Sequence, residues 1–260
     1  LNRELQNDNI RTAYTFKRKF YDIFHKKPIK TMKDVYKELE TQGELWRMEH
    51  EKVNEKTGEI KQVPVPPLNI AKIISKVVPI VMLGDISSKD RSLLYYYNFD
   101  TGLYINSDIE LKNFALKVEY SSTNRTWANV IEILKMYAPL VKPLEDRYLI
   151  PVQNGIYNLK TKQLEPFDPK YIITSKIATA YYPDAVKPTF WDVDKWLYSL
   201  ACGDEEVVTL LWQLMNEAIN PNHTRQKTGI LYGQSGNNGK GTFQTLLINL
   251  IGRKNVSTLK

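Results

Sequence analysis

The chain has 260 residues, enough for one large or two ordinary domains, and its 42% hydrophobic and 25% charged residues are ordinary globular values. A single cysteine, Cys202, excludes a disulfide framework and a cysteine-based zinc cluster; with no apolar run long enough to span a membrane and no signal peptide, we expect a cytoplasmic protein. The 36 Lys and Arg against 29 Asp and Glu give a net charge of +7, which suits a polyanionic partner.

Basic residues are concentrated near the N-terminus. Residues 2–24 are predicted to form a basic amphipathic helix, and the positive charge continues to Lys33. Such a run is most often a solvated helix face, and the alternative is an arm that contacts nucleic-acid phosphates. The candidate DNA-binding residues are Lys17, Arg18, Lys19, Lys26 and Lys27.

The next part of the chain is predicted to alternate helices with strands. A helix is expected over 32–42, and the prolines between Val63 and Pro67 indicate a stiff connector, after which we place a boundary. Beyond it we expect a helix over 68–78, a buried strand over 80–83, a β-hairpin over 94–105 and helices over 107–119 and 124–137. This order permits a winged-helix-like unit over 68–147. The tyrosines Tyr95–Tyr97 either fill the faces of the hairpin, which is the commoner role, or stack on bases.

Residues 148–222 predict a second hairpin followed by two helices. The turn at Asn154-Gly155 separates two short apolar strands, 148–152 and 156–159. The first helix is expected to open at Pro188, and the second to begin at Gly203-Asp204 and end at Asn220.

A glycine-rich stretch opens the last part of the chain, residues 223–260. The apolar residues Ile230–Tyr232 predict a strand, and apolar residues at helical spacing from Phe243 to Ile251 predict a helix. A loop of small residues between a strand and a helix lets backbone N–H groups converge on a phosphate beside the positive end of the helix. The expected nucleotide-binding residues are Gly233, Ser235, Gly236, Asn237, Asn238, Gly239, Lys240, Gly241 and Thr242, with Lys240 as the catalytic cation at the β- and γ-phosphates.

This loop departs from the standard P-loop in two ways. Gly233 and Gly239 enclose five residues, where the standard motif has four, and Gly241 stands where Ser or Thr is usual. Thr242 is the nearest hydroxyl for a magnesium ion, and water is the alternative ligand. A glycine-rich turn without any ligand is the competing interpretation.

Other chemistry-bearing residues carry weaker signals. Asp192 and Asp194 match the Asp-x-Asp pattern of metal sites, but acidic residues at a helix start are explained by the helix dipole. The histidines, His25, His50 and His223, stand alone, without the spacing of a metal or catalytic site.

Three segments together resemble a known family: NGIYNLKTKQLEPFDPKYIITSKIATAYYPDA, FWDVDKWLYSLACGDEEVVTLLWQLMNEAI and KTGILYGQSGNNGKGTFQTLLINLIG. The resemblance is to the phage, plasmid and poxvirus primase-helicases of superfamily 3, over about residues 68–260, and the family's usual NGKGTF loop matches Asn238–Phe243. It implies a homo-hexameric, ring-shaped helicase in the cytoplasm of a bacterial host. Such a helicase would use ATP and Mg²⁺, act on single-stranded or forked DNA, and work with a primase or other replication proteins.

The sequence therefore predicts an α+β fold, mainly helical with two β-hairpins, followed by the first strand–loop–helix unit of a truncated P-loop (AAA+-like) α/β domain. The expected domains are 1–67, 68–147, 148–222 and 223–260. The function we expect is part of an ATP-dependent replicative DNA helicase, whose Walker B, sensor and arginine-finger residues would lie outside this chain and leave it inactive alone. A non-enzymatic nucleic-acid-binding or helicase-loading module stays open, and a P-loop kinase is disfavoured because a long helical region precedes the loop.

Overall fold

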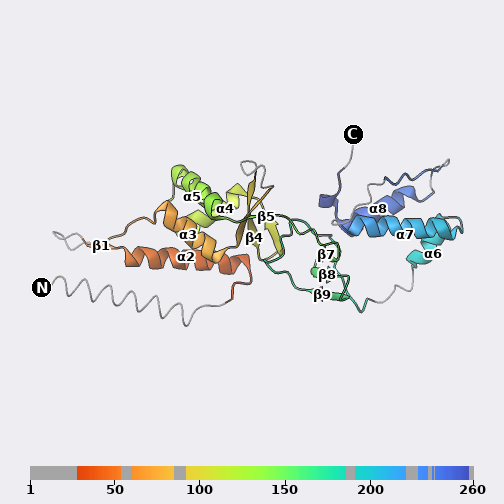
Figure 1. Cartoon of the computed structure of the whole chain (residues 1–260), viewed down its shortest axis with the longest axis horizontal. Coiled ribbons are helices and arrows are strands. Elements are labelled where there is room, and N and C mark those ends of the chain that lie inside the picture. Colours follow the sequence, from red (N-terminus) through yellow and green to blue (C-terminus); the bar gives the residue numbers. More distant parts are fainter. Residues whose placement is uncertain are drawn as a thin grey trace. The chain divides into compact units, whose positions relative to one another are not determined.

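The computed structural model describes residues 28–53, 60–84, 92–185, 191–220, 228–233, 236 and 238–257. The chain divides into two compact units, the first up to Lys142 and the second from Pro143 (Figure 1). Both contain helices and small sheets, in agreement with the expected α+β class. Among the described helices, none is long and apolar enough to cross a membrane.

The first unit contains α2 (Met32–Glu49), α3 (Pro67–Val77), α4 (Asp108–Val118) and α5 (Asn124–Tyr137). Thr31 begins α2 with a capping box, in which its hydroxyl accepts from the Asp34 N–H while the Asp34 carboxylate accepts from the Thr31 N–H.

The expectation that this helix ends at Gln42 is wrong, because Gly43 lies inside it. A Cβ at Gly43 would meet the Val118 carbonyl oxygen at 2.1 Å, so the glycine permits a close approach between α2 and the end of α4.

A four-stranded sheet in the order β5-β4-β3-β6 completes the first unit. Its strands are β3 (Ile80–Leu83), β4 (Leu93–Asn98), β5 (Leu103–Ile105) and β6 (Leu140–Val141), and only β3 and β6 run parallel. The expected hairpin is confirmed as β4 and β5. This hairpin continues into β3, which also pairs with β6. A separate two-stranded pair is formed by β1 (Lys52–Val53) and β2 (Ile60–Lys61).

The tyrosines of β4 belong mainly to the core. Tyr96 and Tyr97 are 4% and 3% exposed, and the Tyr96 ring meets Phe114 edge to face at 5.2 Å. Their rings therefore fill the faces of the hairpin, the commoner of the two expected roles.

One hydrophobic core unites residues on both sides of the boundary that we expected after residue 67. Side chains of α2 pack against those of α3 and α4, α5 packs against α3 and α4, and the same core includes residues of the sheet. Over the described residues, α2 and residues 67–141 are thus one structural unit. Its fully buried members include Val35, Leu39, Ile70, Ile74, Leu111, Phe114, Val118, Val130 and Leu134.

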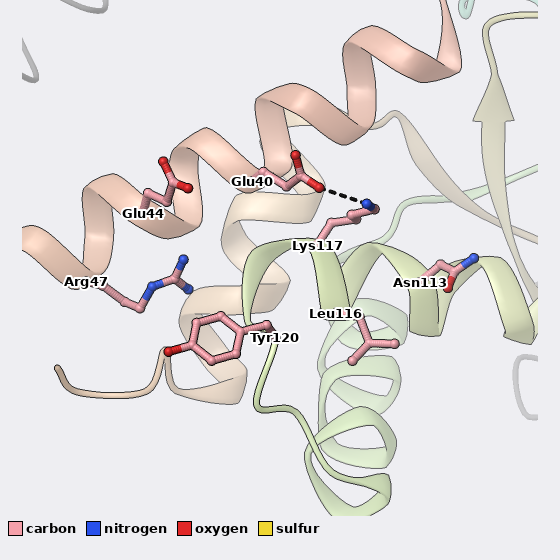
Figure 2. Close-up of a pocket in the computed structure, with 7 residues that line it drawn as sticks. All are labelled: Glu40, Glu44, Arg47, Asn113, Leu116, Lys117 and Tyr120. Atoms are coloured by element: carbon pink, nitrogen blue, oxygen red, sulfur yellow. Dashed lines mark hydrogen bonds and ion pairs between the residues drawn. The ribbon is translucent and has the colours of Figure 1, made fainter.

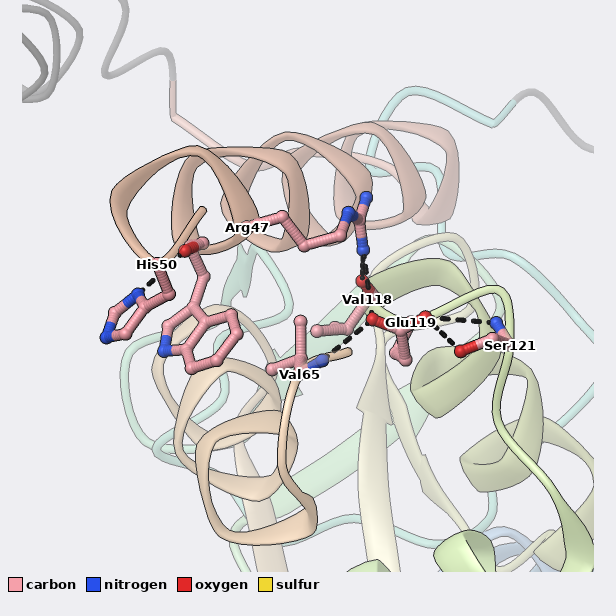
Figure 3. A network of polar contacts seen from close by, with 7 residues as sticks. Arg47, His50, Val65, Val118, Glu119 and Ser121 are labelled. Carbon is pink, nitrogen blue, oxygen red and sulfur yellow. Dashed lines mark hydrogen bonds and ion pairs between the residues drawn. The ribbon is translucent and has the colours of Figure 1, made fainter. Parts of the chain in front are cut away.

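A buried ion pair lies beside this core (Figure 3). The Arg47 guanidinium donates to the Val118 carbonyl at 2.8 Å and to a Glu119 carboxylate oxygen at 3.3 Å. The Val65 N–H donates to that oxygen at 2.8 Å, and the Ser121 N–H and hydroxyl donate to the other. Arg47 and Glu119 are only 7% and 2% exposed, so the network joins α2, the segment before α3 and the end of α4 away from water.

The second unit begins with a three-stranded antiparallel sheet, β7 (Leu149–Val152), β8 (Gly155–Asn158) and β9 (Gln163–Glu165). The expected second hairpin is thereby confirmed. Three helices follow, α6 (Val193–Leu200), α7 (Glu205–Ile219) and α8 (Lys240–Ile251), and then a 3-10 turn, η2 (Arg253–Asn255). The first begins five residues after Pro188, at Val193, because the Asp192 carboxylate caps it.

The segment before α6 connects the sheet with α8. The Gln153 N–H donates to the Thr179 carbonyl at 3.0 Å, and the Thr179 hydroxyl donates to the Leu250 carbonyl at 2.9 Å. The Ala178 N–H donates to the Ile251 carbonyl at 3.2 Å. These bonds hold the end of α8 against the chain that leaves the sheet.

The strand expected at Ile230–Tyr232 is not formed. Ile230 and Tyr232 are 84% and 82% exposed, and no described strand pairs with this segment. A strand needs the backbone hydrogen bonds of a neighbour, so an apolar run alone does not produce one. Of the expected strand–loop–helix unit, the helix is present and the strand is absent from the described residues.

We predict that Arg47→Ala lowers the free energy of unfolding by about 3–5 kcal/mol, because it leaves the Glu119 charge buried without its partner. Lys117→Ala is the matched control, since it breaks the exposed 2.7 Å pair with Glu40 and should cost about 1 kcal/mol or less. Urea unfolding of both variants measures the difference. Equal losses would show that burial does not distinguish the two pairs.

A second prediction concerns the free energy of unfolding at acid pH. Burial by itself would raise the pKa of the Glu119 carboxyl, but hydrogen bonds from Ser121 and the Val65 N–H and the charge of Arg47 lower it below its ordinary value of 4.5. The resulting stabilisation is fully present above pH 4.5 and is lost as the pH falls through the lowered pKa. The unfolding free energy of the wild type should therefore fall more steeply than that of Glu119→Gln in this acid range. Parallel curves would contradict the assignment.

Candidate nucleotide-binding loop

The start of α8 depends on one glycine. Gly239 is the residue before the helix, with φ 81° and ψ −3°, and its carbonyl accepts the first helical bond from the Phe243 N–H at 2.9 Å. This left-handed conformation favours glycine, and a Cβ at this position would lie 2.4 Å from the Leu200 Cδ1 atom. The chain can therefore turn sharply into α8 here and pass close to α6.

The first turn of α8 is held in place by the buried side chain of Phe243. Phe243 is 1% exposed and packs with Leu197, Leu211 and Met215. Its ring lies 6.5 Å from that of Trp196, centroid to centroid. Because the helix start is held by this core, its N-terminal N–H groups have a defined position, and among the described residues no side-chain cap is formed there.

Residues from both ends of the glycine-rich loop lie beside the Lys240 side chain. The Lys240 ammonium donates to the Asn238 side-chain oxygen at 2.6 Å. At the other end of the loop, a Cβ on Gly233 would lie 2.1 Å from the Asn238 amide nitrogen and 2.7 Å from the Lys240 ammonium. The absence of a side chain at Gly233 thus leaves room for the ammonium beside the backbone.

The remaining expected residues are open or lie outside the described residues. Gly236 and Gly241 have nothing within 4 Å of an added Cβ, and Thr242 is exposed. Ser235 and Asn237 lie outside the described residues, as do the basic residues expected to contact DNA, Lys17, Arg18, Lys19, Lys26 and Lys27. The described part of the site therefore consists of Gly233, Gly236 and residues 238–242.

Thr242 has the chemistry of a magnesium ligand but little protein support. No group of three or more His, Cys, Asp or Glu residues that could hold a metal occurs within the described ranges. Mg²⁺ commonly keeps several waters and takes phosphate oxygens with only one or two protein ligands, so a single hydroxyl is compatible with it. Asp192 does not add a ligand, because its carboxylate accepts the Asp194 and Lys195 N–H groups as the cap of α6.

The sequence did not predict that α6 packs against the end of the glycine-rich loop and the start of α8. Leu200 lies against Gly239, and Trp196 and Leu197 lie against Phe243. The signal for these contacts was the apolar spacing in residues 193–200, which predicts a buried face but does not say which helix covers it.

The sequence also gave no indication of a groove between α2 and α4 in the first unit (Figure 2). Its volume is about 430 Å³. Lys117 and Arg47 in its lining already pair with Glu40 and Glu119, so neither cation of the groove is free to select an anionic ligand. The lining residues are Glu40, Glu44, Arg47, Asn113, Leu116, Lys117 and Tyr120.

We predict opposite effects for alanine at two neighbouring glycines. Gly239→Ala should lower the free energy of unfolding of the second unit by about 1–2 kcal/mol, because alanine is strained in the left-handed conformation. Gly241→Ala, inside the helix with free space around it, should be neutral or stabilise by up to about 1 kcal/mol. Thermal unfolding of the two variants tests this, and equal effects would argue against the turn at Gly239.

One comparison with known proteins gives a match, and this match reaches residue 200. A family model described as "D5 N terminal like" matches residues 40–200, more than half of the chain, from within α2 to the end of α6. A search of the curated proteins finds no match. The matched region ends before the glycine-rich loop, so the superfamily 3 helicase part stays a prediction, whereas the resemblance to primase-helicases is supported. The chain belongs to the D5 N-terminal-like family, whose domain is associated with the primase-helicases of phages and viruses.

Proposed function

We propose that the chain is part of an ATP-dependent replicative DNA helicase, a primase-helicase of a phage or other mobile element. Family membership supports the role in replication. The observation that carries the ATP-dependent part is the position of Lys240, whose ammonium lies between Gly233 and Asn238 at the uncapped start of α8.

The chemistry of such a loop follows from its donors. The first N–H groups of α8 have no partner within the helix, and the helix dipole adds a partial positive charge there. Phosphate oxygens of ATP would accept from these groups and from the Lys240 ammonium, which would exchange its bond to Asn238 for a stronger bond to an anion. The Thr242 hydroxyl, or water in its place, would help to hold Mg²⁺, which would offset the negative charge of the phosphates.

In this proposal the protein works as a homo-hexameric ring on single-stranded or forked DNA, with a primase or other replication proteins, in the cytoplasm of a bacterial host. The net charge of +7 supports a nucleic-acid partner. Lys17, Arg18, Lys19, Lys26 and Lys27 remain the proposed phosphate contacts of the N-terminal segment. Contacts of this kind would weaken with salt and would not distinguish one DNA sequence from another.

We predict that Lys240→Ala in the complete protein lowers DNA-stimulated ATP hydrolysis by about 100-fold or more, because it removes the cation nearest the transferred phosphate. Lys254→Ala is the matched control, since Lys254 is an exposed lysine of η2 and its removal changes the net charge equally. Release of phosphate with and without single-stranded DNA measures the effect.

The result separates the proposal from its alternative. If Lys240→Ala loses ATP turnover while Lys254→Ala keeps it, and thermal unfolding is unchanged in both, the result supports an ATPase that uses this loop. Equal turnover in both variants would reject that role for the loop and favour a non-enzymatic nucleic-acid-binding or helicase-loading module.

A further inference from the structure

One face of the three-stranded sheet in the second unit carries tyrosines, with basic side chains beside them. We call it the tyrosine surface and define it by Arg147, Tyr148, Tyr157, Lys160, Lys162 and Tyr181. This grouping lies on the sheet and in its flanking turns, and none of its residues belongs to the glycine-rich loop.

The backbone register places two of the tyrosines on the same face of the sheet. The Leu159 N–H donates to the Tyr148 carbonyl at 2.8 Å, which extends the pairing of β7 with β8 by one residue beyond Leu149 and Asn158. Tyr148 is therefore opposite Leu159, two residues from Tyr157, and alternate residues of a strand share a face. The Tyr157 ring packs against that of Tyr181, with 4.3 Å between centroids.

Two basic side chains lie over the Tyr148 ring, and the Tyr148 N–H donates to the Asp146 carboxylate at 2.9 Å. The Lys160 ammonium lies 4.1 Å from the centre of the Tyr148 ring, and the Arg147 guanidinium carbon lies 4.9 Å from it. Arg147 also donates to the Tyr148 hydroxyl at 2.9 Å. None of the contacts that the structure gives to Arg147 or Lys160 within the described ranges is an ion pair with a carboxylate.

The third cation, Lys162, acts electrostatically on Tyr181, whose ring is tilted by 37° against that of Tyr157. The pKa of Tyr181 is raised, mainly by its hydrogen bond with Tyr157, and the positive charge of Lys162 opposes this shift. Asp184 is the nearby negative group that acts on Tyr181 in the opposite sense. Lys162 is exposed, with φ 59°, in the turn between β8 and β9.

A purely structural role fits these tyrosines less well than it fits those of the first unit. Tyr96, Tyr97 and Tyr104 are 3–4% exposed and pack within a core. Tyr148, Tyr157 and Tyr181 are each only partly buried. Exposed cation–π contacts such as that of Lys160 are weak and screened by water, so a base could replace the ammonium on the ring while the ammonium turns to a neighbouring phosphate.

We propose that the tyrosine surface binds single-stranded DNA. Bases would stack on Tyr148 and on the Tyr157–Tyr181 pair, and Arg147, Lys160 and Lys162 would contact the phosphates. Aromatic rings that solvent reaches, among basic side chains, are the combination by which proteins bind single strands without sequence preference. The choice of DNA over RNA rests on the proposed function, whereas the single-strand preference rests on these partly exposed rings.

The first test replaces the ring of Tyr148. Tyr148→Leu keeps an apolar side chain but cannot stack, and it should weaken binding of fluorescein-labelled oligo-dT by about 5- to 150-fold. Tyr148→Phe keeps the ring and should bind within about 3-fold of the wild type, since stacking needs only the ring face. Fluorescence anisotropy of the full chain without nucleotide measures both, and unlabelled duplex should compete less well than unlabelled oligo-dT.

The second test removes charge. Lys160→Ala combined with Lys162→Asn should reduce the slope of log affinity against log salt by about 0.7 for each lost phosphate contact. Asparagine is chosen at Lys162 because it tolerates the left-handed backbone there. Lys195→Ala combined with Lys254→Ala removes the same charge from exposed positions on the helical side of the unit and should leave the slope unchanged.

The outcomes separate this inference from the proposed function. Wild-type affinity and salt slope in folded Tyr148→Leu and in the Lys160/Lys162 variant would overturn it, even if Lys240→Ala abolishes ATP hydrolysis. Binding that depends on Tyr148, in a protein whose ATP turnover ignores Lys240, would support it while the ATPase proposal fails. If Tyr148→Leu does not fold, as judged by circular dichroism, the Lys160/Lys162 variant decides alone.

Discussion

The arrangement of the first unit depends on a buried pair of opposite charges, Arg47 and Glu119. A buried guanidinium or carboxylate is costly alone, and the pair is tolerated because each member finds its partner and further hydrogen bonds. Arg47 comes from α2 and Glu119 follows α4, and the Val65 N–H comes from the segment before α3. Hydrophobic burial supplies most of the favourable free energy, and the pair penalises any packing that buries one charge without the other.

In the second unit, packing determines where the glycine-rich loop ends. Burial of Phe243 holds the first turn of α8, and the left-handed backbone of Gly239 lets the chain enter it beside Leu200. The position of Lys240 is a consequence of these two contacts, because it is the first residue of the helix. Residues of α6 take part in both contacts, and α6 lies within residues 40–200, the part of the chain that matches the family.

The two candidate surfaces of the second unit use different chemistry. The loop offers backbone N–H groups and one cation at a rigid helix start, which suits the compact charge of a phosphate. The tyrosine surface offers ring faces and long, exposed basic side chains, which suit an extended polyanion whose bases have apolar faces. The contrast with the buried tyrosines of β4 and β5 shows that residue type alone does not separate a core aromatic from a binding one. Exposure does so, and exposure depends on what packs nearby.

The sequence by itself determined the features that depend on near neighbours: the β4–β5 and β7–β8 hairpins, α3 to α5 almost to the residue, and the order glycine-rich loop then helix. Turn residues, caps and hydrophobic periodicity act within a few residues, so they can be read directly. Only the tertiary structure decided that α2 continues through Gly43. The glycine is needed there because the Val118 carbonyl, which is distant in sequence, packs against it. The tertiary structure also decided that Ile230–Tyr232 forms no strand among the described residues, since an apolar segment becomes a strand only when another strand satisfies its backbone hydrogen bonds.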